Sequence, residues 1–189
     1  SADAHRFMTL QAFLSIVNDP YLPRHGQPKL CIIFRGKGMR ISAEEFAAYH
    51  PDVIVLWQPK AWADSGLSNK WAIEVATQSV LKTECKRGER HMILCDNLSS
   101  QTIKTNPQFG KLLDTACKAD VWNLLPGNTD EIQVVDAGFG ASVKREALEV
   151  QSEWQDVDAT FAGWTAGRLS ANRRRVLSTL WYGEAYDRV

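Results

Sequence analysis

The chain has 189 residues, of which 44% are hydrophobic and 23% charged, and its 22 basic residues balance 22 acidic ones. This composition is typical of one globular domain, with or without a small appended subdomain. Because the net charge is zero, overall charge gives no argument for a polyanionic partner, and any nucleic-acid surface must be a local basic patch. No apolar run approaches the ~18 residues of a membrane-spanning helix, and no signal peptide is visible.

The four cysteines are far apart in the sequence and form no Cys-x-x-Cys pair; they are Cys31, Cys85, Cys95 and Cys117. This spacing fits neither a zinc site nor a disulfide-dense secreted scaffold. It favours a reducing compartment, either cytosol or nucleus. The chain begins with Ser1 rather than Met, so we expect it to be part of a longer protein.

The first third of the chain predicts strands. Residues 5–17 and 29–34 are rich in β-formers, and the polar turn between them indicates an antiparallel hairpin with a long loop. Ser42 precedes two glutamates and predicts the N-cap of a short helix through residue 49. Residues 53–57 predict a third strand. Ser68 is the expected cap of a helix over 68–86, with an apolar face that includes Ile73 and Ala76.

An apolar run at residues 92–95 leads directly into Asp96 and Asn97. Such a run predicts a strand buried on both faces. An acid at the carboxyl end of a buried strand lies where α/β folds place their ligands. The alternative is that Asp96 or Asn97 caps the following turn, and position alone leaves both interpretations open.

The remaining pattern alternates helix and strand and then becomes helical. Residues 107–118 and 142–154 predict helices, and 121–125 predict a strand; residues 156–189 predict two helices that meet near Ser170. The order predicts an α/β domain with a mixed sheet over residues 1–155 and a helical tail over 156–189. Trp57, Trp71 and Trp122 are expected to be buried, and Trp62 to be exposed.

Five motifs occur in one order along the chain: Phe-Arg-Gly-Lys-Gly at 34–38, Gln-Pro-Lys-Ala-Trp at 58–62, Ile-Leu-Cys-Asp-Asn at 93–97, Leu-Pro-Gly-Asn-Thr-Asp at 125–130 and Gln-Val-Val-Asp-Ala-Gly at 133–138. Together they resemble the DDE superfamily endonuclease domain of pogo-like transposases (the DDE-1 group). The segment at 173–185 is similar to the tail of some members.

The sequence departs from the family pattern at three points. Gln101 stands where the family often has His, and Val134 stands where it often has Pro. The family's first catalytic acid has no candidate in this chain, and the pattern would place it before Ser1.

The resemblance implies a ribonuclease-H-like fold, a mixed sheet flanked by helices. It also implies DNA strand cleavage or transfer with Mg²⁺ (or Mn²⁺), and a nuclear protein. Asp96 and Asp136 would be the second and third catalytic acids and metal ligands, meeting at one sheet edge. Carboxylates suit Mg²⁺, and two such ions stabilise the attacking and leaving oxygens of the displacement. Asn97 would orient Asp96 or bind substrate, and a local turn bond is the alternative. Gln101 and Gln133 could contact metal-bound water or DNA.

Two basic clusters could contact phosphates: Arg35, Lys37 and Arg40 beside glycines, and Arg173, Arg174 and Arg175 at a predicted helix start. The plainer alternatives are a solvated turn and a solvated helix end. The four histidines, including His50, show no ligand spacing. The competing interpretations of the chain are a domesticated, catalytically inactive module that binds nucleic acid or protein, and an unrelated α/β domain. A homo-oligomer is possible under any of them.

Overall fold

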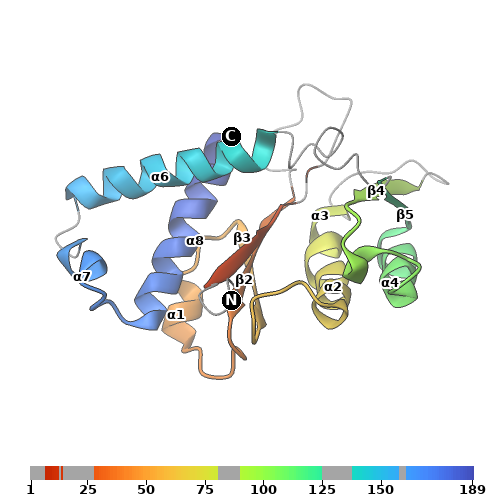
Figure 1. Ribbon diagram of the computed structural model, residues 1–189, viewed down its shortest axis with the longest axis horizontal. Helices are drawn as coiled ribbons and strands as arrows, with labels where there is room; N and C mark the ends of the chain where they lie inside the picture. The colour runs from red at the N-terminus through yellow and green to blue at the C-terminus, as the bar shows by residue number, and fades with distance from the viewer. Residues whose placement is uncertain (1–6, 13, 15–27, 81–89, 125–137, 158–160) are drawn as a thin grey trace.

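The computed structural model describes residues 7–12, 14, 28–80, 90–124, 138–157 and 161–189, and every structural statement below concerns these residues. They form a mixed α/β structure in which helices lie on both sides of a small mixed sheet (Figure 1). The α/β class and the helical C-terminus predicted from the sequence are confirmed. Among the described helices, none combines the length and apolar character that crossing a bilayer requires.

The first sheet has three strands in the order β1 (Met8–Gln11), β2 (Leu30–Arg35) and β3 (Val53–Gln58). β2 pairs antiparallel with β1, as the predicted hairpin requires, and parallel with β3. The crossover from β2 to β3 contains the short helix α1 (Ala43–Ala47). Ser42 caps this helix as expected, because its hydroxyl accepts the Glu45 backbone N–H.

Strand β2 is buried on both faces because successive side chains point to opposite sides of a sheet. Leu30, Ile32 and Phe34 pack in one cluster with Tyr182 and Tyr186 of the C-terminal helix. Cys31 and Ile33 belong to the cluster on the opposite side. Helices therefore cover both faces of this sheet.

A continuous helical run follows β3, made of α2 (Ser65–Trp71), the π-helical turn η3 (Ala72–Ala76) and α3 (Thr77–Val80). Two expectations about this helix are wrong. Asp64, not Ser68, is the N-cap, because its carboxylate accepts the Leu67 N–H at 2.8 Å and Ser68 is buried. Ile73 is exposed, because the packed face carries Trp71, Ala72 and Val75 together with the expected Ala76.

The second sheet contains β4 (His91–Cys95) and β5 (Ala119–Asn123), which run parallel. The single-turn helix η4 (Ser99–Gln101) and α4 (Pro107–Cys117) connect them. The described strands therefore form two sheets rather than the single mixed sheet that we expected. A ribonuclease-H-like fold is a narrower assignment than this mixed α/β architecture, and it stays a prediction.

Strand β4 is buried on one face only. Ile93 and Cys95 are buried, whereas Met92 and Leu94 are 63% and 52% exposed. Trp122, paired with Leu94 on β5, is 62% exposed. The predictions that β4 is covered on both faces and that Trp122 is buried are therefore wrong, because α4 and η3 pack against the other face. Trp71 is buried and Trp62 is exposed, as predicted.

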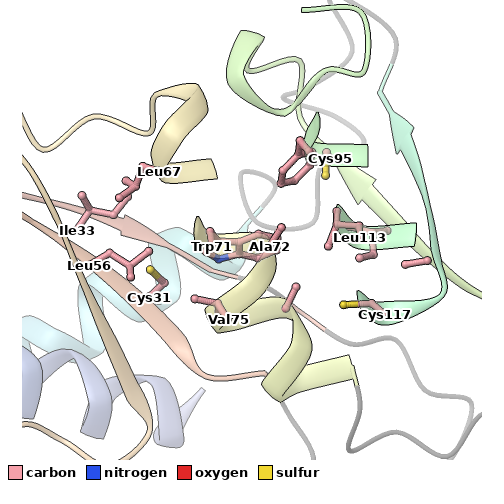
Figure 2. Packing of buried hydrophobic residues seen from close by; sticks show 14 residues of the cluster. Cys31, Ile33, Leu56, Leu67, Trp71, Ala72, Val75, Cys95, Leu113 and Cys117 are labelled. Carbon is pink, nitrogen blue, oxygen red and sulfur yellow. The ribbon is translucent and has the colours of Figure 1, made fainter. Parts of the chain in front are cut away.

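The largest hydrophobic cluster joins the two sheets through the helix between them. Figure 2 shows Trp71, Ala72 and Val75 between Leu56 of β3 on one side and Leu113 of α4 on the other. The small side chains of Ala72 and Ala76 bring this helix close to its neighbours, and the Trp71 ring lies 6.2 Å from that of Phe109. The relative position of the two sheets thus depends on this shared core.

The C-terminal part contains α6 (Gly140–Val157), α7 (Phe161–Thr165) and α8 (Ala171–Arg188). Ser170 caps α8, as predicted, by accepting the Arg173 N–H. Trp154 of α6 and Trp164 of α7 pack edge-on against Trp181 of α8, at ring distances of 5.3 and 4.8 Å. These aromatic contacts hold the three helices together on the α1 side of the first sheet (Figure 1).

Candidate functional site

Asp96 follows the last residue of β4 and is half-buried at the carboxyl end of this parallel strand. Its Oδ1 accepts the backbone N–H of Asn97 at 2.5 Å, which is the local turn bond that we held open as an alternative. The side-chain Nδ2 of Asn97 is buried and has no hydrogen-bond partner within the described part of the chain. A buried donor without a partner is costly, so an acceptor bound next to this amide would remove that cost.

Hydrogen bonds with β5 and with the loop before α2 fix the segment that follows Asp96. The Asn123 Nδ2 donates to the carbonyl oxygens of Asp96 and Gln101, at 3.3 and 3.2 Å. The Ser100 hydroxyl donates to the Ala63 carbonyl at 2.6 Å. These bonds tie the end of β4 to β5 and to the loop that enters α2.

A second set of buried polar groups supports Ser100. Its hydroxyl accepts from Ser68, and its carbonyl accepts from the Asn106 amide at 2.7 Å. The same amide donates to Asn69 Oδ1 at 3.0 Å. Our sequence reasoning missed Asn106 and Asn123, although a polar residue directly after an apolar strand, as at Asn123, is the same signal that singled out Asp96.

Of the other residues predicted for this site, the structure describes some and not others. Gln101 lies in η4 and is only 8% exposed. Asp136 and Gln133 lie outside the described residues, so the expected meeting of Asp96 and Asp136 remains a prediction.

The loops after β2 and β3 lie side by side. Arg35 and Gln58 are register partners, and the Gly36 N–H donates to the Gln58 carbonyl at 3.0 Å. Lys37 and Arg40 on the first loop and Lys60 on the second are exposed.

Both loops have a fixed geometry. Gly38 has φ +66°, and a Cβ there would come within 2.6 Å of the Trp57 ring, so only glycine fits without strain. In the other loop the Gln58 side chain accepts the N–H groups of Lys60 and Trp62 and donates to Asp64 at 2.9 Å. The sequence signalled this loop only through the Gln-Pro-Lys-Ala-Trp motif.

The C-terminal arginines make contacts within the chain. Arg175 forms a two-point ion pair with Glu45 at 2.6 and 2.9 Å, and its guanidinium lies 5.2 Å from the centre of the Trp57 ring. Arg174 donates to the carbonyls of Leu169 and Gly167 at 3.1 and 2.7 Å. Arg173 is exposed. Arg174 and Arg175 thus have structural partners, which weakens their role as phosphate contacts.

A group that could hold a metal ion lies elsewhere, at the amino end of β3. Side-chain ligand atoms of His50, Asp52 and Asp187 all lie within 4.8 Å of one another. We missed this group because Asp187 is remote in sequence; the His-x-Asp spacing at 50–52 was the available signal.

The three cysteines in the described part are buried. Burial raises the pKa of Cys31 and Cys117, and it raises the pKa of Cys95 to about 12. These thiols are therefore protonated at neutral pH and are poor metal ligands or nucleophiles.

Comparisons of the chain with protein-family models, with curated proteins and with solved structures found no match. The resemblance to DDE endonucleases therefore rests on the sequence motifs alone.

Proposed function

We propose that this chain is a transposase-derived DDE-type endonuclease domain that binds DNA and, in the intact parent protein, supports metal-dependent strand cleavage. The observation that carries the proposal is the placement of Asp96. It leaves the carboxyl end of a parallel strand into a segment held by Asn123, Ser100 and Asn106. Open α/β sheets bind their ligands at such strand ends, and these hydrogen bonds order the backbone from which the carboxylate extends.

The donor chemistry at this strand end fits the implied cofactor. Asp96 is half-buried and offers hard carboxylate oxygens, the ligand type that Mg²⁺ or Mn²⁺ prefers. According to the sequence motif at residues 133–138, Asp136 would be the second metal ligand. The buried Asn97 amide is a donor, so its complement is an acceptor such as a phosphate oxygen or a water molecule. When bound, the metal would neutralise charge that develops on the phosphate.

The neighbouring loops support DNA as the partner. Residues 35–41 carry three cations and no acid, although the whole chain has zero net charge. The exposed Trp62 on the adjacent loop offers a ring on which an unpaired base can stack. Because Ala63 is bonded to Ser100, this basic and aromatic surface adjoins the Asp96 segment.

The second candidate function is a DNA-binding module without catalysis. It is favoured by the way in which Gln58 and Gly38 order the basic loops without any contribution from Asp96. Such a module needs the loops but not the carboxylate.

DNA affinity with and without Mn²⁺ separates these functions. For an endonuclease domain, Mn²⁺ should strengthen binding of a fluorescent DNA to the wild type, and Asp96→Asn should abolish that effect. Asp156→Asn, which changes an exposed acid on α6, is the matched control and should behave as the wild type. Equal, metal-independent affinity of all three proteins would favour the binding module, and absence of DNA binding would contradict both functions.

A further inference from the structure

One face of α8 holds the His50 segment. Thr179, Gly183 and Asp187 are spaced by four residues and therefore lie along one stripe of the helix. The backbone N–H of His50 donates to the Thr179 hydroxyl at 3.2 Å. A Cβ on Gly183 would lie 2.2 Å from His50 Cγ, so the imidazole occupies the space that a side chain would otherwise fill. The ring is thus fixed against α8 and only 13% exposed.

Two carboxylates flank this ring. His50 Nε2 lies 3.8 Å from Asp187 Oδ2, one helical turn beyond Gly183. The Asp52 backbone N–H donates to His50 Nδ1 at 3.2 Å, which brings the Asp52 side chain to the same place. We propose that His50, Asp52 and Asp187 form a divalent metal site that joins the C-terminal end of α8 to the amino end of β3.

The distances suit coordination after a small closure. In a tetrahedral site, metal–ligand bonds of about 2.0–2.2 Å place the ligand atoms about 3.3–3.6 Å from one another. The present ligand atoms lie within 4.8 Å of one another. The Asp52 and Asp187 side chains are 53% and 49% exposed, so rotation of either can close the gap, and water can complete the coordination shell.

The donor set selects the class of metal. One imidazole nitrogen with two carboxylate oxygens suits Zn²⁺, Mn²⁺ or Co²⁺ better than Mg²⁺ or Ca²⁺, which prefer oxygen ligands alone. Coordination would change the present interactions of both His50 and Asp52. The Asp52 N–H bond fixes Nδ1 as an acceptor, so coordination through Nε2 exchanges that bond for a proton on Nδ1. A metal on Asp52 would replace its ion pair with Lys29, whose Nζ lies 4.0 Å from Asp52 Oδ1. Lys29 would keep its hydrogen bond to the Pro51 carbonyl.

This site is independent of the proposed nuclease site, which follows β4 at the carboxyl end of a strand. A metal that binds only the folded chain raises the free energy of unfolding, and this gain grows with the metal concentration. The ion would therefore act as a clamp between α8 and the first sheet.

Calorimetry with Zn²⁺ and with Mn²⁺ tests the site, and Mn²⁺-induced broadening of backbone NMR signals locates it. The proposal predicts saturable binding with broadening centred on His50, Thr179 and Gly183. Asp187→Asn and His50→Asn should each weaken metal binding by at least about tenfold. Substituting a residue that only hydrogen-bonds to a metal ligand already lowers metal affinity by about that factor.

Asp96→Asn and Asp156→Asn serve as controls and should leave the broadening around His50 unchanged. Far-UV circular dichroism of each variant checks that the fold persists. The proposal is overturned if neither metal binds at submillimolar concentration, if Asp187→Asn binds as the wild type does, or if Mn²⁺ leaves the signals around His50 unbroadened. None of these results depends on whether the chain binds DNA, so the two proposals fail separately.

Discussion

At position 183, the backbone of α8 passes so close to His50 that an added methyl group would overlap the imidazole. The Cβ of an alanine would come within 2.2 Å of Cγ and 2.8 Å of Cβ of His50. Overpacking of this kind costs about 1–3 kcal/mol, although alanine recovers about 1 kcal/mol of helix propensity. We expect Gly183→Ala to lower the free energy of unfolding, measured in urea, by up to about 2 kcal/mol.

Gly110 in α4 provides the matched control. A Cβ there would meet the flexible side chain of Ile103 at 3.3 Å, and Ile103 is 47% exposed and able to move. Gly110→Ala should therefore be neutral or stabilising. If both substitutions proved stabilising, the close approach of His50 to α8 would be incorrect.

Among the helices, α8 is held to α1 by a mostly buried ion pair between Arg175 and Glu45. The Arg175 and Glu45 side chains are 15% and 4% exposed, and Tyr49 donates a further hydrogen bond to Glu45 at 2.7 Å. Removing one partner of a buried pair leaves an uncompensated charge, which costs about 3–5 kcal/mol. We expect Arg175→Met to destabilise the fold by about this amount in urea unfolding.

The exposed pair between Arg188 and Glu153 is the comparison for Arg175→Met. Its atoms approach to 2.8 Å, but both partners are accessible to solvent, which screens the interaction. Glu153→Gln should leave the unfolding midpoint unchanged. Equal effects of the two substitutions would show that burial of the Arg175 pair has no energetic consequence.

The same ion pair predicts how stability depends on pH. The hydrogen bonds from Arg175, which contribute most, and from Tyr49 lower the pKa of Glu45 in the folded chain. Its stabilisation is complete above the ordinary glutamate pKa of about 4.3. It is lost as pH falls from there through the lower folded pKa, because the unfolded chain binds the proton first. Between pH 6 and 3, unfolding free energies of Glu45→Gln should fall less steeply than those of the wild type; parallel curves would contradict this assignment.

The sequence predicted most elements of the structure but not which faces they bury. Ser42 and Ser170 cap their helices as expected, because capping is a local interaction. Asp64 replaced Ser68 as a cap because the Gln58 side chain orders the preceding loop, a contact that no local pattern reveals.

The exposure of Met92, Leu94 and Trp122 was not predicted, because apolar character alone does not tell whether one or two layers cover a strand. Asp96 was predictable from its strand. The contacts of Asn106 with Asn69 and, at the metal-binding group, of Asp187 with His50 arise only from tertiary packing.

Across the whole molecule, chemistry-bearing groups gather at opposite ends of β3. His50 and Asp52 precede the strand, whereas Gln58 and the basic loops follow it. Positive charge is thus concentrated at the carboxyl end even though the chain as a whole is neutral. This asymmetry allows the contribution of the basic loops to DNA binding to be measured without disturbing the contacts of α8.

Replacing Lys37, Arg40 and Lys60 together by alanine should weaken DNA binding and flatten its salt dependence. Removal of one cation that neutralises a phosphate reduces the slope of log affinity against log salt by about 0.9 for duplex DNA and about 0.7 for a single strand. The slope of the triple variant should therefore be shallower by about two units or more, and its affinity should fall for all sequences alike because phosphates carry no sequence information. The control replaces Lys111, Lys144 and Arg168, three exposed cations on other elements, by alanine and removes the same charge. If the two variants changed the slope equally, binding would depend on overall charge and not on these loops.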